Sequence, residues 1–295
     1  MLWINLFLLG CIYLFLPIIY FQFRNNAKPK RGMILSVTLP THGQEDREVL
    51  DYCSRFRKKL TALFWCLTAA LLPFIFVPFF SVSLMAGFVW MDAAMVAIFW
   101  FYGKEHAGMK ALKQRRGWRT AADTSSIEDN DDFWIWGQFY CNPNDRRTLV
   151  PDRTGMNLST NFAKSGVKVL YAICILLLLA LPLLGVWTMK EEFSPLTVSL
   201  TEQAVVAEHN NTEYEVRLED VIKAELLTEL PKTWKQSGSN MPNLYKGRFT
   251  VDGYGTCRVC LDPNAESFLL LRTENDIWLF SGEQADLRQI LEVLP

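Results

Sequence analysis

The sequence contains few histidines and none of the short patterns on which familiar active sites depend. Its three histidines, His42, His106 and His209, are far apart along the chain. No metalloprotease helix motif, nucleophile elbow, phosphate-binding loop or dinucleotide fingerprint occurs. We therefore expect no catalytic residues, no cofactor, no resident metal and no nucleic-acid partner, and we predict that the protein is not an enzyme.

The seven cysteines show no pairing pattern. Cys257 and Cys260 are the closest pair, but they fall in a predicted strand. Residues three apart on a strand point to opposite faces and lie about 10 Å apart, which is too far for a disulfide. A tetrahedral zinc site would need two further ligands, and no second pair exists. We expect both cysteines to be strand residues, at least one of them buried.

Charge is almost absent from four long apolar segments. They are Leu2–Phe23, Leu60–Phe80, Val82–Gly103 and Val167–Met189. Each has about the 20 apolar residues that a helix needs to cross a bilayer. The first lacks a basic start and a small-residue cleavage site, so we interpret it as a signal anchor. The sequence thus predicts an integral membrane protein with four transmembrane helices, in which Pro73 and Pro78 kink the second span.

Basic residues are concentrated between the apolar segments. Residues 24–59 carry nine Lys and Arg, and six more lie in 104–119, whereas residues 190–295 carry ten basic and eighteen acidic residues. By the positive-inside rule both basic loops are cytoplasmic. The N-terminus, the turn near Ser81 and the acidic tail are then extracellular. The inverted orientation stays open, and lipid headgroups would then be the natural ligand of the tail.

These observations divide the chain into parts. We predict a first span at 1–23, a cytoplasmic loop at 24–59, a hairpin of two spans at 60–103, a cytoplasmic basic helix and aromatic box at 104–166, a fourth span at 167–189, and a β domain at 195–295.

Asp92 is the one acidic residue near the centre of a predicted span. A carboxylate there is costly unless it is paired, protonated or facing water, which makes it a candidate binding residue. No Lys or Arg lies in the core of any span, so Asn5 or backbone groups near Pro73 and Pro78 are its expected hydrogen-bonding partners. Both an ion-handling role and a packing role stay open.

An aromatic box occupies residues 131–161, after an acidic linker at 121–132. Its turn signals are Asn142-Pro-Asn-Asp145 and Gly155. The box either packs on the cytoplasmic ends of the spans or forms a recognition surface. Its candidate binding residues are Trp134, Trp136, Tyr140, Asn142, Asp145 and Asn161.

The tail has the alternating pattern of short strands. We predict strands at 196–200, 204–208, 213–218, 222–227, 247–251, 256–261, 267–272 and 277–281. A helix follows at 283–294 with Ser281 as its N-cap, and 228–244 is a flexible loop. The fold class is thus a four-helix membrane region plus a mainly-β barrel or sandwich closed by a C-terminal helix.

With this pattern the tail resembles a bacterial pleckstrin-homology-like domain. The box resembles a domain of unknown function in bacterial membrane proteins, often beside an SdpI-like membrane region. The residues that carry this second resemblance are Val37–Pro40, Leu112–Trp118, Trp134, Gly137, Tyr140, Asn142–Asp145, Val150–Pro151, Gly155 and Asn161. The resemblance implies architecture, not chemistry. Because the tail is acidic, phosphoinositide binding is not expected.

From these features we predict a non-enzymatic sensor, scaffold or immunity-type protein of the cell membrane. Its C-terminal domain would bind a protein or peptide partner. The alternative is a small transporter or channel component that uses Asp92, perhaps as a homo-oligomer. A weaker possibility is an enzyme that acts on lipid or peptide.

Overall fold

The computed structural model describes residues 2–119, 130–153 and 158–294. The chain divides into two compact units. We call the first the helical unit, which comprises Trp3–Phe76 and Leu84–Leu183. The C-terminal unit comprises Leu184–Pro295 together with Met1–Leu2 and the turn Val77–Ser83. Residues 121–129 of the linker predicted at 121–132, and the turn predicted at Gly155, lie outside the described residues.

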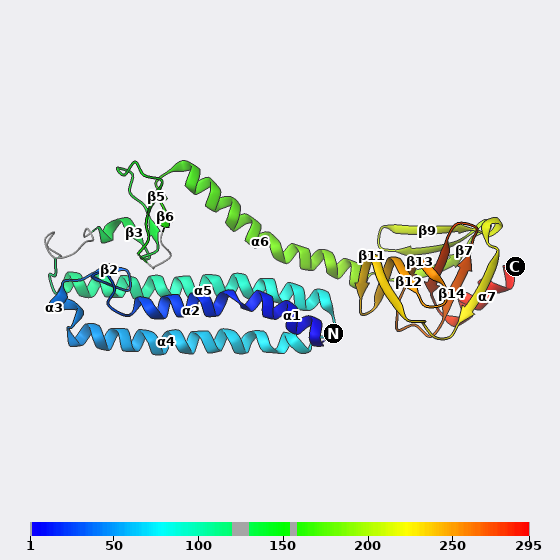
Figure 1. The fold of residues 1–295 in the computed structure, drawn as a ribbon, viewed down its shortest axis with the longest axis horizontal. Helices are drawn as coiled ribbons and strands as arrows, with labels where there is room; N and C mark the ends of the chain where they lie inside the picture. The colour runs from blue at the N-terminus through cyan, green and yellow to red at the C-terminus, as the bar shows by residue number, and fades with distance from the viewer. Residues whose placement is uncertain (1, 120–129, 154–157, 295) are drawn as a thin grey trace. The chain divides into compact units, whose positions relative to one another are not determined.

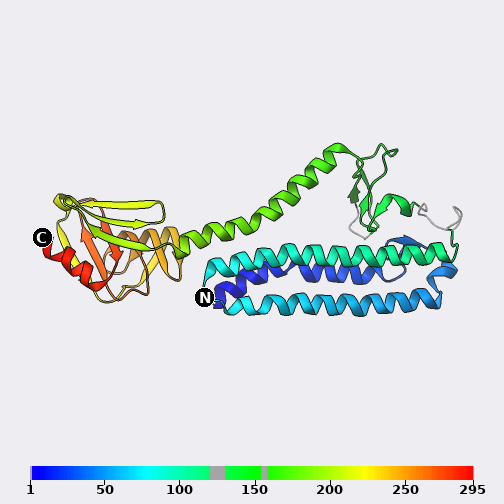
Figure 2. The same ribbon diagram turned by 180° about the vertical axis from the view of Figure 1, so that it is seen from behind.

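Four helical stretches are long and apolar enough to cross a membrane. They are α1 with α2 (Leu2–Tyr13 and Phe15–Asn26), α4 with η1 (Arg47–Leu71 and Leu72–Phe76), α5 (Phe80–Arg115) and α6 (Ser165–Phe193). Helices α2, α4 and α5 lie side by side in both views (Figures 1 and 2). In α6 only 6% of the apolar window is buried within the protein.

Prolines determine where the first two stretches are interrupted. The first stretch breaks at Leu14, because the ring of Pro17 is incompatible with a regular helix at the carbonyl of Tyr13, four residues earlier. In the second, α4 ends at Leu71 and continues as one short 3-10 segment through Pro73. We predicted a kink at Pro73; the α-helix instead ends there, and Pro78 lies in the turn that follows.

The third predicted span continues without interruption into the basic segment. Helix α5 reaches Arg115, so the basic residues after Gly103 belong to the same helix as the apolar ones. Between α2 and α4 lie a small hairpin, β1 (Met33–Ile34) with β2 (Val37–Thr38), and the short helix α3 (Thr41–Gln44). The first basic loop therefore contains an antiparallel hairpin.

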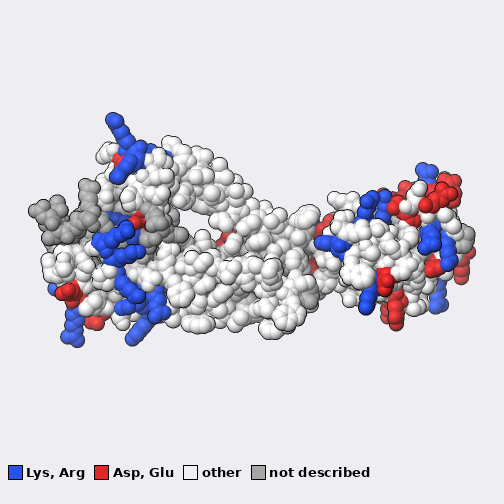
Figure 3. Space-filling view, viewed as in Figure 1, with Lys and Arg blue, Asp and Glu red and all other residues white. Residues whose placement is uncertain are grey.

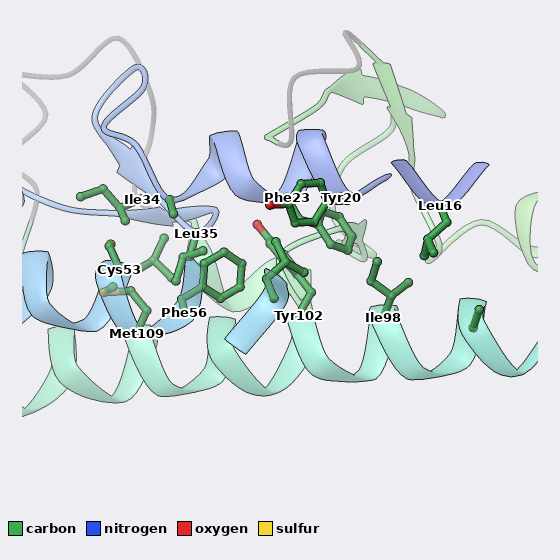
Figure 4. Close-up of a cluster of buried hydrophobic side chains, with 14 of the residues drawn as sticks. Leu16, Tyr20, Phe23, Ile34, Leu35, Cys53, Phe56, Ile98, Tyr102 and Met109 are labelled. Carbon is green, nitrogen blue, oxygen red and sulfur yellow. The ribbon is translucent and has the colours of Figure 1, made fainter. Parts of the chain in front are cut away.

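Large side chains from α2, α4, α5 and the β1–β2 hairpin form one core (Figure 4). The ring of Phe23 stacks on that of Tyr102 with centroids 4.2 Å apart, and Phe56 makes an edge-to-face contact with Tyr102 at 6.2 Å. Phe23, Phe56 and Tyr102 are at most 2% exposed. This end of the helical unit is consequently packed like the interior of a soluble domain.

The aromatic box consists of two small hairpins. One pairs β3 (Trp134–Ile135) with β4 (Phe139–Tyr140), after the 3-10 turn η2 (Asp131–Phe133). The other pairs β5 (Leu149–Pro151) with β6 (Leu158–Thr160). A parallel bridge between Tyr140 and Asn161 joins the two hairpins.

Two antiparallel-rich sheets and a helix form the C-terminal unit. The first sheet has the order β7–β8–β9, and the second has the order β10–β14–β15–β13–β12–β11, in which β13 and β15 are parallel. The first sheet and its following turn are β7 (Leu196–Leu200), β8 (Ala204–His209), β9 (Thr212–Arg217) and η3 (Leu218–Asp220). The rest are β10 (Lys223–Leu227), β11 (Thr233–Met241), β12 (Leu244–Val251), β13 (Gly255–Leu261), β14 (Phe268–Arg272), β15 (Ile277–Ser281) and α7 (Gln284–Val293).

Helix α7 covers one end of the sheets, as Figure 2 shows. Its buried residues Leu287 and Ile290 join a core cluster with Val205 of β8 and Phe280 of β15. This arrangement has the strands and the closing helix that the sequence pattern predicts. Glu283, not Ser281, occupies the N-cap of α7, because the Ser281 hydroxyl instead accepts a hydrogen bond from the amide of Asp262 at 2.7 Å.

One strand was missed. The loop predicted at 228–244 contains β11, which pairs with β12 along its full length. Two glycines face each other in this ladder, Gly238 and Gly247. A Cβ on Gly238 would lie 2.0 Å from the carbonyl oxygen of Lys246, so the close approach requires glycine. The polar composition of β11 reflects its exposed edge position rather than flexibility.

Candidate functional site

The tip of the β1–β2 hairpin is strained and buried. Leu35 and Ser36 have φ angles of 50° and 63°, although neither is glycine. They are 0% and 3% exposed. A bulky residue in this conformation is held only when its surroundings determine it, and such strain concentrates at functional sites. We therefore begin the search for a site at the groups that hold this tip.

Hydrogen bonds from α5 and the box hold both tip residues. The Ser36 hydroxyl lies 2.8 Å from the Tyr102 hydroxyl. The Leu35 carbonyl lies 2.9 Å from Nδ1 of His106, and the Ser36 carbonyl accepts from Arg153 at 3.0 Å. The turn is thus clamped by segments far from it in sequence.

A buried carboxylate lies beside this turn. Asp131 accepts hydrogen bonds from Nζ of Lys113 at 2.6 Å, from Nη1 of Arg153, and from the hydroxyl of Thr38 at 2.9 Å. The side chains of Asp131, Lys113 and Arg153 are at most 9% exposed. A buried carboxylate with two buried cations is a network whose members depend on one another. We call Asp131, Lys113, Arg153 and Thr38 the buried ionic centre.

Sequence reasoning did not identify the buried ionic centre. Asp131, in the 3-10 turn η2, lies 18 residues after Lys113 of α5 and 22 residues before Arg153. Of these residues only Asp131 stands out in the sequence, because it is the first residue of the aromatic box. Partners brought together by tertiary packing have no characteristic spacing.

The predicted box residues Tyr140, Asn142, Asp145 and Asn161 do lie together. Asn161 is fully buried, and its amide nitrogen donates to the carbonyls of Asn142 at 2.8 Å and Asp145 at 3.2 Å. Its oxygen accepts from the amide of Asn142 at 3.1 Å. Asn161 therefore fixes the course of the Asn142–Asp145 turn from inside.

Tyr140 closes the same network. Its hydroxyl donates to Asp145 at 3.1 Å and accepts from the Asn142 side chain at 3.1 Å. Burial raises the pKa of Tyr140. The hydrogen bonds from Arg147 hold the pKa of Asp145 well below its usual range. These polar groups satisfy one another, so their first role is to hold the loop in shape.

The two tryptophans of the box differ in exposure. Trp134 is 5% exposed, packs against Tyr140 with centroids 5.3 Å apart, and has the Arg153 guanidinium 5.2 Å from its ring centroid. Trp136 is 46% exposed and lies against α5, where a Cβ added to Gly103 would be 2.7 Å from its ring. Trp134 thus supports the buried ionic centre, and Trp136 anchors the hairpin on α5.

Asp92 lies apart from these residues. It is half-buried on α5, and within the described ranges it makes no hydrogen bond or ion pair. The sequence predicted Asn5 as a hydrogen-bonding partner of Asp92. The side-chain amide of Asn5 instead donates to the carbonyl of Ile75 at 3.2 Å. The structure therefore does not bring Asp92 into either site.

Cys257 and Cys260 are both buried free thiols on β13. Burial raises the pKa of each to about 11, so both stay protonated at neutral pH. Protonated, buried thiols are poor nucleophiles and poor metal ligands. In the described parts of the chain, no three His, Cys, Asp or Glu side chains are arranged to hold a metal ion.

The last turn of α6 is a second buried polar site, and it lies within the C-terminal unit. The carboxylate of Glu192, a residue that is 2% exposed, accepts from the amides of Phe80 at 3.0 Å and Ser81 at 2.7 Å. These are the first amides of α5, which have no partner inside that helix. The negative charge also opposes the positive end of the helix dipole. Glu192 thus caps the turn between the second and third predicted spans.

The neighbouring residue, Glu191, faces the β domain. Its carboxylate lies 3.4 Å from Nζ of Lys246 and 3.9 Å from Nδ1 of His209, and it accepts from Asn210 at 2.9 Å. Burial lowers the pKa of His209, and the adjacent Lys246 lowers it further. His209 is therefore neutral at neutral pH, and Lys246 carries the positive charge opposite Glu191. We call Glu191, Glu192 and their partners the junction.

A polar pocket of about 730 Å³ opens beside the junction. Among the described residues, its lining includes the carboxylates of Glu192, Asp262, Glu266 and Glu283 and no Lys or Arg. A second pocket of about 520 Å³ lies beside β9. Both are surfaces on which an uncharged or cationic group would be favoured over an anionic one.

Comparison with known proteins identifies the C-terminal domain. Residues 196–292 match the family model described as "Bacterial PH domain". This range starts at the first residue of β7 and ends within α7. No curated protein and no solved structure gives a significant match to the chain. The match thus supports a PH domain in the C-terminal part of the chain.

Proposed function

We propose that this chain, whose residues 196–292 form a bacterial PH domain, is a non-enzymatic sensor, scaffold or immunity-type protein of the cell membrane. In this proposal α1 with α2, α4, α5 and α6 cross the bilayer. The PH domain lies outside the cell and binds a protein or peptide partner. The basic loops and the aromatic box lie in the cytoplasm.

The junction is the observation that carries this proposal. Two consecutive residues at the end of α6 contact different parts of the chain. Glu191 contacts the β domain, and Glu192 caps the start of α5. The amide of Asn243, in the β11–β12 turn, donates to the carbonyl of Glu192 at 2.6 Å. A partner that displaces the β11–β12 turn would therefore act on the turn between two spans.

The charge of the domain favours a protein partner over an anionic lipid. Carboxylates line the pocket beside the junction, and the domain has an excess of acidic residues. Anionic headgroups would be repelled by such a surface. The transporter alternative is weaker, because Asp92 meets no second ionisable group among the described residues, as a proton or ion relay would require.

Site-specific photo-crosslinking in living cells tests this function. A photoreactive phenylalanine analogue would replace Ile222 or Gln284, which are exposed on different parts of the PH domain, or Leu149, which is exposed on the box. We expect a discrete adduct from at least one domain position, and the same adduct when Asp92→Asn is also present. Adducts from neither domain position would refute partner binding by the domain. Loss of the adduct with Asp92→Asn would favour the ion-coupled alternative.

A further inference from the structure

Strand β9 is an unpaired edge of the first sheet. It pairs with β8 and, within the described residues, with no other strand. Along an antiparallel edge, every second residue turns its amide and carbonyl away from the sheet. Glu213, Glu215 and Arg217 have exposed side chains, whereas Val216 is buried in the core. The edge is therefore a regular strand with backbone groups available for pairing.

A groove runs along this edge. It has a volume of about 520 Å³ and lies between β9 with the following turn, on one side, and the β14–β15 turn with Trp278, on the other. Trp278 makes an edge-to-face contact with Tyr214 at 5.9 Å. Ile222, which also lines the groove, is 58% exposed. The groove thus combines a strand edge with an apolar wall.

Acidic residues dominate the charge of the groove. Its lining contains one guanidinium, that of Arg217, and five carboxylates: Glu215, Glu219, Asp220, Glu274 and Asp276. Arg217 is paired with Glu219 at 3.5 Å, and Asp276 is paired with Arg258 at 3.2 Å. The other three carboxylates make no ion pair with any described residue. Figure 3 shows several groups of acidic side chains, with basic ones between them, on the surface of the C-terminal unit.

We propose that an extended, Lys- or Arg-containing segment of a partner protein adds to β9 as a further strand and lies in this groove. This inference rests on the proposed function and names the chemistry of its partner. Backbone pairing would supply affinity, and contacts with alternate side chains would supply specificity. Basic side chains of the segment would meet Glu215, Asp220 and Glu274, and small apolar ones would face Ile222 and Trp278.

The same charges argue against other occupants. An anionic membrane or a nucleic acid would be repelled by the five carboxylates. A second copy of this chain that paired β9 with β9 would bring Glu213 and Glu215 near their counterparts, and like charges on neighbouring strands are destabilising. A basic peptide is the occupant that the groove charge favours.

A synthetic peptide with alternating lysine and valine tests the proposal. A fluorescein-labelled Lys-Val-Lys-Val-Lys-Val peptide would be added to the full chain in uncharged detergent, and binding followed by fluorescence anisotropy. The control peptide has Glu in place of Lys. We expect binding of the Lys peptide only. The double substitution Glu215→Lys with Glu274→Lys should weaken it at least tenfold. The matched control, Glu202→Lys with Glu229→Lys, changes charge equally at exposed sites outside the groove and should leave Kd within twofold.

Peptide N-methylation tests strand pairing separately from charge. Methylation of residues 1, 3 and 5, or of residues 2, 4 and 6, blocks the amides that face one neighbour or the other. We expect one pattern to abolish binding and the other to retain it. The proposal would be overturned if the Lys peptide did not bind. It would also be overturned if the two methylation patterns had equal effects, or if the groove double variant and its matched control weakened binding equally. Crosslinks in cells from Gln284 but not from Ile222 would refute the groove while leaving partner binding by the domain intact.

Discussion

At the scale of single residues, Asp131 is the acid of the buried ionic centre. It balances Lys113 and Arg153 in a place that water does not reach, and it fixes Thr38 at the base of the strained turn. Replacing one member of a buried ion network leaves the others with uncompensated charge, and this costs more than the network itself contributes.

Asp131→Ala is therefore expected to lower the free energy of unfolding by about 3 kcal/mol, the typical cost of breaking a buried pair. Unfolding of the purified chain in detergent can be followed by tryptophan fluorescence, because Trp134 lies beside Arg153. Asp132→Ala is the matched control. Asp132 pairs with Lys110 at 2.7 Å, but its side chain is 87% exposed, so the loss should stay below about 1 kcal/mol. Similar losses of unfolding free energy for Asp131→Ala and Asp132→Ala would contradict the expected cost of breaking a buried ion network.

At the scale of helices and strands, the start of α5 is held by a side chain from the end of α6. Helix α5 begins at Phe80, two residues after Pro78. Its first amides are satisfied by Glu192, which is 111 residues away from Ser81 in sequence. The end of one predicted span thus depends on the end of another.

Glu192→Ala should destabilise the C-terminal unit by about 2 kcal/mol, because it leaves two buried amides without a partner and removes the charge at the helix terminus. The measurement is the thermal unfolding midpoint of the purified chain, with Glu208→Ala, at an exposed strand position, as the control. The proposed coupling adds a second readout: Glu192→Ala should change the reactivity of a cysteine placed at Phe79 toward a thiol reagent. An unchanged midpoint together with unchanged reactivity would contradict a capping role.

For the whole molecule, the proposed membrane orientation can be tested directly. The distribution of Lys and Arg predicts that the PH domain is extracellular and that the basic loops are cytoplasmic. The native cysteines of the domain suit a labelling experiment, since Cys257 and Cys260 are buried and protonated at neutral pH.

A membrane-impermeant maleimide should accordingly label Glu202→Cys on intact cells but label Glu45→Cys only after lysis. Both positions are exposed, one in the PH domain and one in the first basic loop. A Cys141→Ser background removes the half-buried thiol of the box. The opposite pattern would place the PH domain in the cytoplasm, and lipid headgroups and cytoplasmic proteins would then be its candidate ligands.

Much of the architecture followed from local patterns. The four apolar segments, the β-rich tail and the C-terminal helix could be predicted because apolar length and strand alternation are properties of neighbouring residues. Strand β11 was missed because an exposed edge strand has no apolar alternation, and its Ser, Gly and Asn residues resemble a loop. The two breaks at Leu14 and Leu71 follow from Pro17 and Pro73, although the sequence alone did not show whether a proline would kink or end its helix.

The sequence by itself determined the four long apolar segments, most strands of the C-terminal part, and where positive charge collects. The tertiary structure alone decided the polar sites. In the folded chain Asp131 binds Lys113 and Arg153, and Glu192 accepts hydrogen bonds from the first amides of α5. The carboxylates near β9 line one groove. The physical reason is that periodicity and hydropathy depend on residues close in sequence. The energy of a buried charge depends on partners that only folding brings within hydrogen-bonding distance.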